Sequence, residues 1–348
     1  MEHADNTNLI PYRVGDKWGF CDASRNILIA PKYLAAEPFT DGRGFIEAGT
    51  EFGGKYGFVD LLGNEVVPPI YDDAQPFSES LASIMFYYND GLEYKFGYID
   101  LMGNVVIPPK YKYGHDFEGG LASVELADKR GFIDKDGVEV IPIKYEKVGF
   151  FDNGLVDVVL NGKPYFLNRN GETVLSLDYD SIMGFSEGLA GVSLNGKDGF
   201  INRAGELVID FLYNSSGGHL EGLAFVEING KCGFVDQTGR EVIKLKYENA
   251  GEFREGLASF KQNGKWGFLN KADEIVIEPK YDYTHEFSEG LSSVELNGKQ
   301  GFIDRFGNEV IPLKYDFACM YFTNGLALVR IDEVDFYIGK DGTEYYEA

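Results

Sequence analysis

The chain is 348 residues long and 44% of its residues are hydrophobic, which is enough for a buried core and excludes a disordered chain. Its 44 glycines, 27 phenylalanines and 22 tyrosines, against 12 prolines, favour many short strands joined by turns. The formal net charge of −24 would repel a phosphate backbone and excludes nucleic acid as the expected partner; it indicates the solubility of a long array or, as the alternative, a basic protein partner.

The first residues lack the basic start, apolar run and cleavage site of a secretory signal, and no stretch approaches the roughly 18 apolar residues of a membrane span. We therefore expect a cytoplasmic protein that does not bind a membrane. Cys21, Cys232 and Cys319 are odd in number and occupy different positions of the repeat described below. They are predicted to be reduced structural thiols and not a disulfide framework or a metal site.

An aromatic residue that normally follows glycine recurs through the chain and defines ten units. We call these aromatic residues the anchors. Consecutive anchors from Tyr98 to Phe302 are 34 residues apart, and a tyrosine occurs thirteen residues after each of the first nine anchors. Two aromatic positions that recur together predict one tandem array over residues 1–348. The anchors are Phe20, Phe58, Tyr98, Phe132, Phe166, Phe200, Phe234, Phe268, Phe302 and Tyr337.

A period of 34 residues also fits helix-hairpin repeats, but glycine and proline interrupt every apolar run before it reaches helix length. In one unit the runs 291–296, 299–304 and 308–315 are β-branched, aromatic and partly alternating, which predicts strands. Asn297-Gly298 predicts a tight hairpin between the first two strands. Each unit is thus expected to form a three-stranded antiparallel meander, followed by a linker with a short helical turn or a bent fourth strand.

Three short strands cannot bury an apolar face alone, so neighbouring meanders must stack on one another. The predicted fold is therefore all-β, with the units in series forming a propeller-like toroid or an open superhelical array. An open arc is favoured because no strand is marked for exchange between the two ends of the chain. The linker aromatic residues predicted as core are Phe39, Phe77, Phe117, Phe151, Phe185, Phe253, Phe287 and Phe322, with His219 replacing phenylalanine once.

Residues 15–33 (GDKWGFCDASRNILIAPKY) and 263–291 resemble the bacterial WG repeat, also called the KWG repeat. The Gly-aromatic pair, the turn glycine, the V-I-x-P-x-Y run and the F-x-x-G-L linker match together over nearly the whole chain. Tryptophan remains only at Trp18 and Trp266, and Tyr165 and Phe336 replace the glycine before the anchor. The resemblance implies a repeated β architecture and a role in binding, and it supplies no catalytic residues. A weaker likeness to the hairpin repeats of choline-binding proteins leaves carbohydrate binding as an alternative.

Candidate chemistry is sparse in this sequence. The histidines His3, His115, His219 and His285 occur without metal-site spacing, and His115 and His285 share one linker position, where packing is expected. Nucleophile-elbow and phosphate-loop motifs do not occur, so we predict no catalytic residues, no metal and no cofactor. An Asp or Asn that follows most anchors is predicted to start a turn by accepting backbone hydrogen bonds. This column holds Asp22, Asp60, Asp100, Asp134, Asn168, Asn202, Asp236, Asn270 and Asp304.

The repeat is least regular in its second and third units, where residues 46–58 and 84–99 lengthen the first hairpin. The second insertion places Phe86, Tyr87, Tyr88, Leu92 and Tyr94 on a protruding loop. Grouped exposed aromatic residues are typical of interface hot spots, so these five are the predicted partner-binding residues. The alternative is that the long hairpin caps the end of the array.

These observations predict a non-catalytic repeat scaffold that binds another protein, with a basic partner favoured by the acidity. A carbohydrate-binding or cell-wall-binding module is the alternative, and a hydrolase in a groove of the array is the least favoured hypothesis.

Overall fold

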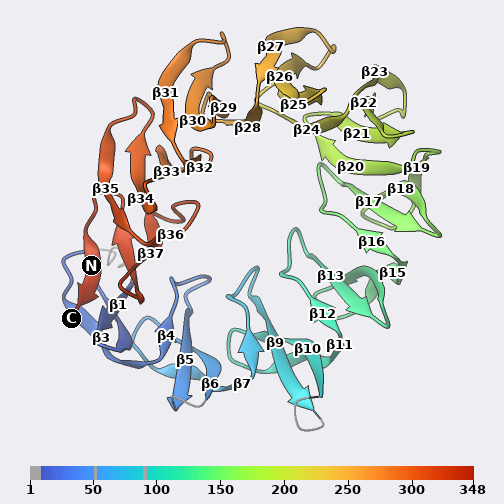
Figure 1. Cartoon of the computed structure of the whole chain (residues 1–348). Helices are drawn as coiled ribbons and strands as arrows, with labels where there is room; N and C mark the ends of the chain where they lie inside the picture. Colours follow the sequence, from blue (N-terminus) through green and yellow to red (C-terminus); the bar gives the residue numbers. More distant parts are fainter. Residues whose placement is uncertain (1–8, 51–52, 89–91) are drawn as a thin grey trace, which may run out of the picture. The chain divides into compact units, whose positions relative to one another are not determined.

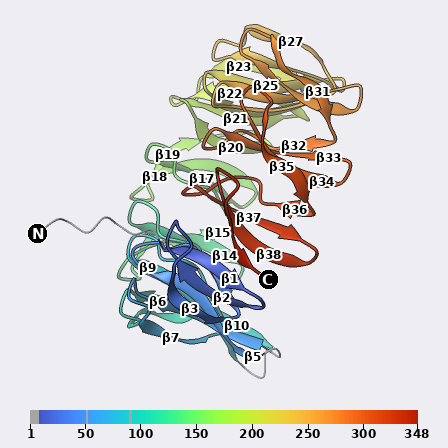
Figure 2. The same cartoon turned by 90° about the vertical axis from the view of Figure 1, so that its left-hand side faces the viewer.

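The structure is a computed structural model that describes residues 9–50, 53–88 and 92–348. Figure 1 and Figure 2 show strands, turns and loops, and no helix occurs among the described residues, which confirms the predicted all-β class. Consequently no helix that could span a membrane is found in this part of the chain. The chain divides into two compact units. Unit 1 comprises Met1–Val148, Arg169–Gly171 and Tyr345–Ala348, and unit 2 comprises Gly149–Asn168 and Glu172–Glu344.

Up-and-down sheets of four strands are the repeating element, with strand orders β4-β5-β6-β7, β8-β9-β10-β11 and β12-β13-β14-β15 in unit 1. Unit 2 repeats the pattern in β20-β21-β22-β23, β24-β25-β26-β27, β28-β29-β30-β31 and β32-β33-β34-β35. This is the sheet topology of a β-propeller blade. The linker therefore forms the bent fourth strand and not the helical turn that was its alternative.

The strands before residue 149 are β1 (Ile10–Val14), β2 (Lys17–Cys21), β3 (Ile27–Tyr33), β4 (Ala35–Ala36), β5 (Gly44–Thr50), β6 (Gly53–Val59), β7 (Glu65–Tyr71), β8 (Asp73–Ala74), β9 (Leu81–Tyr88), β10 (Glu93–Asp100), β11 (Val105–Tyr111), β12 (Tyr113–Gly114), β13 (Leu121–Leu126), β14 (Lys129–Asp134), β15 (Glu139–Tyr145) and β16 (Lys147–Val148). The later strands are β17 (Leu155–Leu160), β18 (Lys163–Asn168), β19 (Thr173–Ser176), β20 (Ser181–Ser186), β21 (Leu189–Leu194), β22 (Lys197–Asn202), β23 (Leu207–Tyr213), β24 (Ser215–Leu220), β25 (Leu223–Ile228), β26 (Lys231–Asp236), β27 (Glu241–Tyr247), β28 (Asn249–Arg254), β29 (Leu257–Gln262), β30 (Lys265–Asn270), β31 (Ile275–Tyr281), β32 (Tyr283–Thr284), β33 (Leu291–Leu296), β34 (Lys299–Asp304), β35 (Glu309–Tyr315), β36 (Phe317–Ala318), β37 (Leu326–Ile331), β38 (Val334–Gly339) and β39 (Glu344–Glu347).

The first hairpin of each regular sheet closes as the sequence predicts. Leu296 of β33 lies opposite Lys299 of β34, which leaves a loop of Asn297 and Gly298. Both loop residues have positive φ, 56° and 74°. Asparagine and glycine tolerate this left-handed conformation, and the turn matches the twist of the two strands.

The glycine before the anchor is fixed by a bulge between the second and third long strands. Gln300 pairs with Tyr315 but Phe302 pairs with Ile311, so β35 carries extra residues beside Gly301. A Cβ atom at Gly301 would lie 2.6 Å from the carbonyl oxygen of Ile311. Any side chain at this position would therefore collide with the bulged backbone.

The fifth unit shows what happens without this glycine. Tyr165 occupies the position and pairs with Ser176, while Phe166 pairs with the adjacent Leu175, so the wide bulge is missing. The third strand, β19, is only four residues long, against seven in β23 and in β35. The Gly-aromatic pair is therefore a backbone requirement of the regular unit.

The core lies between consecutive sheets, as the stacking argument predicts. Phe268 packs edge-to-face on Phe287 of the next linker with ring centroids 4.9 Å apart, and Tyr281 and Val294 join the same cluster. His219 is fully buried in the linker position and packs on an anchor phenylalanine in the same way. Phe39 and Phe151 are partly buried. The buried linker phenylalanines are Phe77, Phe117, Phe185, Phe253, Phe287 and Phe322, which confirms them as core.

Glutamates in the linkers connect successive repeats in a way that the sequence did not indicate. The Glu255 carboxylate accepts a hydrogen bond from the Gly290 backbone N–H at 3.0 Å, and Glu289 does the same for Gly325. In unit 1, Glu79 accepts from Gly120. Each of these charge-assisted bonds joins one turn to the equivalent turn of the next repeat.

The ends of the described chain meet in unit 1. The last strand, β39, pairs in parallel with β1, with Arg13 opposite Tyr346 and Val14 opposite Glu347. The Gly15 N–H also donates to the Glu347 carbonyl oxygen at 2.8 Å. The expectation that no strand joins the two ends was therefore wrong, because β39 covers the free edge of β1.

Candidate functional site

The lengthened hairpin of the third unit continues its sheet outward. β9 and β10 pair in register from Leu81 opposite Asp100 to Tyr88 opposite Glu93. Residues 89–91 between the two strands lie outside the described residues, as do His3 and residues 51–52 of the other long hairpin.

The five predicted partner-binding residues do not form one patch. Phe86 is partly buried and packs on Tyr71 with ring centroids 5.2 Å apart. Tyr87, Tyr88 and Tyr94 are 51%, 40% and 44% exposed. Strand alternation places Tyr87 and Tyr94 on one face and Tyr88 on the other. Leu92, at 87% exposure, begins the return of the chain toward β10.

The face that carries Tyr87 and Tyr94 continues into a longer feature, which we call the aromatic row: Tyr87, Tyr94, Phe96, Tyr113 and His115. Successive ring centroids are 6.3, 6.0, 5.4 and 4.7 Å apart, mostly in edge-to-face geometry. Such contacts favour defined relative positions of the rings. Tyr87, Tyr94 and Tyr113 are exposed, and the buried Phe96 links the hairpin tyrosines to the linker strand β12.

The sequence did not indicate that Tyr113 and His115 extend the row of the hairpin tyrosines, because they lie in and directly after β12, which belongs to the next sheet. One sequence pattern does single these two residues out. His115 and His285 share a linker position, and each follows a tyrosine by two residues.

At the His115 end, the aromatic row borders a cavity of about 100 Å³. Desolvation raises the pKa of the Asp73 and Asp116 carboxyls, and the neighbouring His115 acts in the opposite direction on Asp116. Desolvation lowers the pKa of His115. Burial and the charge of Asp73 also raise the pKa of Glu37. The cavity is lined by Asp73, Gln75, Phe96, Tyr113, Gly114, His115 and Asp116.

Within the described part of the chain, no Lys or Arg side chain forms an ion pair with Asp73, Asp116 or Glu37. A cation that entered the cavity would stabilise the ionised carboxylates and would lie against the aromatic rings. The arrangement is therefore suited to a lysine or arginine side chain.

The recurring Asp or Asn after the anchor has the predicted turn role. Asp60 Oδ1 accepts hydrogen bonds from the backbone N–H groups of Leu62 and Asn64, both at 2.9 Å. The Asn64 side chain bonds to the other carboxylate oxygen, and these bonds lower the pKa of Asp60. Equivalent bonds occur at Asp100 and Asp304.

The other candidate residues have packing roles. His285 contacts Tyr283 with ring centroids 4.9 Å apart, which confirms linker packing at this position. Cys21 and Cys232 are buried and Cys319 is partly buried, and all three are free thiols. Burial raises the pKa of the Cys21 thiol to about 12, which leaves it protonated at neutral pH.

The protein is a tandem β-repeat protein. Its four-stranded sheets carry glycine and aromatic residues at equivalent positions, and neighbouring sheets share their cores. Nine segments match the family model described as the WG containing repeat, and together they span most of the chain, so the protein belongs to the WG-repeat family. The segments are residues 18–49, 56–86, 96–129, 131–163, 166–197, 199–232, 233–266, 266–299 and 301–334. The tenth predicted unit, anchored at Tyr337, follows the last match.

Among solved structures, the crystal structure of a eukaryotic initiation factor is similar to this chain with a TM-score of 0.52. It is 11% identical, and the similarity covers 97% of this chain and 95% of the other. This likeness concerns the fold alone. Hsv2p of Kluyveromyces lactis has a TM-score of 0.39 and 9% identity, with 64% of this chain and 87% of the other covered. No curated protein matches the sequence.

Proposed function

We propose that this WG-repeat protein is a non-catalytic scaffold that binds a basic segment of another protein through the aromatic row and its adjoining acidic cavity. The observation that carries the proposal is the chain of ring contacts that leads from exposed tyrosines through the buried Phe96 to carboxylates that lack a Lys or Arg partner among the described residues. The binding segment would lie along Tyr87 and Tyr94 and insert a cationic side chain between Asp73 and Asp116.

Three physical effects support this assignment. Exposed, pre-ordered tyrosines supply contact area with little loss of side-chain entropy. A lysine or arginine in the cavity gains both a cation–π contact and the attraction of two carboxylates. The net charge of −24 would accelerate encounter with a basic partner.

The proposal is tested with a short fluorescein-labelled peptide of alternating Lys and Leu and a matched peptide with Glu in place of Lys. Fluorescence anisotropy is measured at physiological ionic strength, which screens non-specific attraction. We expect the Lys peptide alone to bind. Tyr94→Ser and Asp116→Asn should each weaken binding at least about tenfold, equivalent to about 1.4 kcal/mol.

Leu62→Ser is the matched control, because Leu62 is an 84% exposed apolar residue of unit 1 outside the aromatic row. It should leave the affinity unchanged. Equal binding of the two peptides, or equal losses in all three variants, would refute the proposal. Glycan binding that is lost in Tyr94→Ser but kept in Asp116→Asn would instead support the carbohydrate-binding alternative.

A further inference from the structure

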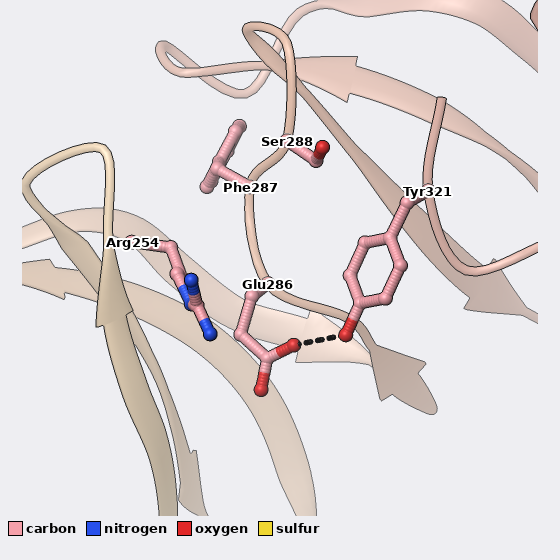
Figure 3. Close-up of a pocket in the computed structure, with 5 residues that line it drawn as sticks. All are labelled: Arg254, Glu286, Phe287, Ser288 and Tyr321. Carbon is pink, nitrogen blue, oxygen red and sulfur yellow. Dashed lines mark hydrogen bonds between the residues drawn. The ribbon is translucent and has the colours of Figure 1, made fainter. Parts of the chain in front are cut away.

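A second cavity, of about 210 Å³, lies in unit 2 and differs in chemistry from the acidic cavity of unit 1. Arg254 ends the linker strand β28, and Tyr321 belongs to the linker after β36. Figure 3 shows the Glu286 carboxylate between the Arg254 and Tyr321 side chains. The cavity is lined by Arg254, Glu286, Phe287, Ser288 and Tyr321.

Tyr321 lies in the last linker, which has an extra residue. Seven residues lead from Tyr315 to Phe322, whereas six lead from Tyr281 to Phe287. The Tyr321 hydroxyl donates a hydrogen bond to Glu286 Oε2 at 2.5 Å, and this bond raises the pKa of Tyr321 to about 12. The phenol therefore stays protonated and fixes one oxygen of Glu286.

The two charged groups of the cavity keep unused hydrogen-bonding capacity. The closest ion pair of the Arg254 guanidinium among the described residues is a loose one with Glu252, at 3.9 Å. Among the described residues, Arg254 and Glu286 form no ion pair with each other, and Glu286 Oε1 accepts no hydrogen bond. A guanidinium has five N–H donors and a carboxylate accepts several bonds, so both could receive a ligand.

We infer that this cavity binds a free α-amino acid in its zwitterionic form. The ligand carboxylate would take the bidentate position on Arg254, and the ligand ammonium would bond to Glu286 Oε1. A simple cation would be repelled by Arg254, and a simple anion by Glu286 and Glu252. Burial and the charge of Glu286 raise the pKa of Glu252, while Arg254 acts in the opposite direction, so an ammonium group nearby would also favour ionised Glu252.

The size of the cavity agrees with this ligand class. At about 210 Å³ it is smaller than the roughly 300–1,000 Å³ of pockets for drug-sized molecules. The Tyr321 ring provides an aromatic wall for the amino acid's side chain. The site lies within unit 2 and does not depend on the peptide surface proposed for unit 1.

Isothermal titration of the full chain with L-leucine, N-acetyl-L-leucine and L-leucinamide tests the inference. The two derivatives lack the ammonium and the carboxylate charge, respectively. We expect each to bind at least about tenfold more weakly than leucine. Arg254→Gln should abolish the preference for leucine over leucinamide, and Glu286→Gln should abolish the preference over N-acetyl-leucine.

Arg305→Gln is the matched control, because Arg305 is an exposed arginine of unit 2 outside the cavity, and it should leave leucine binding unchanged. Equal affinities for leucine and leucinamide would show a plain cation site and overturn the inference. The absence of binding for leucine and for the other proteinogenic amino acids, tested in the same way, would also overturn it.

Discussion

The requirement for glycine before the anchor makes a sharp prediction for Gly267→Ala. The added Cβ atom would lie 2.4 Å from the Ile277 carbonyl oxygen, 2.7 Å from the Pro279 nitrogen and 2.9 Å from the Glu278 carbonyl carbon. Ordinary contacts between such atoms are about 3.5–4.0 Å, and all three neighbours are backbone atoms of the bulged strand. The substitution can therefore be accommodated only if β31 moves.

Overpacking of this kind destabilises proteins by about 1–3 kcal/mol, and the rigid backbone neighbours place Gly267→Ala near the upper value. The lower entropy of the unfolded alanine chain offsets about 0.4–1 kcal/mol. We therefore expect the free energy of unfolding to fall by about 2 kcal/mol.

The assay is guanidinium unfolding in a Trp18→Phe background, where the fluorescence of Trp266 on β30 reports on its pairing with Tyr281 of β31. Gly217→Ala is the control, because its Cβ would meet its nearest neighbour at 3.5 Å, an ordinary contact. It should raise the free energy of unfolding by about 0.4–1 kcal/mol, because no clash opposes the entropy term. A loss below about 0.5 kcal/mol for Gly267→Ala would show that the bulge does not require glycine.

Three further predictions concern carboxylates. Glu255→Ala should lower the free energy of unfolding by about 1 kcal/mol, because the Gly290 N–H loses its acceptor. Glu255→Gln should lower it by less, because the amide oxygen can still accept the bond. Equal urea midpoints for both variants and the parent would contradict this role. Hydrogen bonds from Thr238 and nearby backbone lower the pKa of Asp236 to about 2. Its stabilisation is therefore present above the unfolded pKa of about 3.9 and is lost as pH falls toward 2, and Asp236→Asn should flatten the urea midpoint over that range; a parallel pH profile would count against it. Burial raises the pKa of Asp157, so its ionised form destabilises the folded state at pH 7 and Asp157→Ser should raise the melting temperature there. The gain should shrink as pH falls through that raised pKa, because the aspartate becomes protonated. A gain that stays constant with pH would exclude an ionisation effect.

The sequence predicted the parts of the fold that depend on short-range geometry. The Asn297-Gly298 turn, the Gly-aromatic pair and the buried linker phenylalanines follow from local backbone conformation and from the period of the repeat. The WG-repeat family could be recognised for the same reason, because each repeat carries its own complete pattern.

The candidate sites could be predicted only in part. Tyr87 and Tyr94 were found because an insertion interrupts the repeat, but the aromatic row also needs Tyr113, which a different sheet supplies. Tyr321 and Glu286 are 35 residues apart in the chain, and no local pattern links them.

The sequence by itself determined the all-β class, the repeated strands, the turns and the core positions, because each unit specifies these within its own period. Only the tertiary structure decided the fourth strand, the pairing of β39 with β1, the glutamate bonds between repeats and the two cavities. Those features arise where separate repeats meet, and the contacts there are made by side chains and strand edges that are distant in the chain.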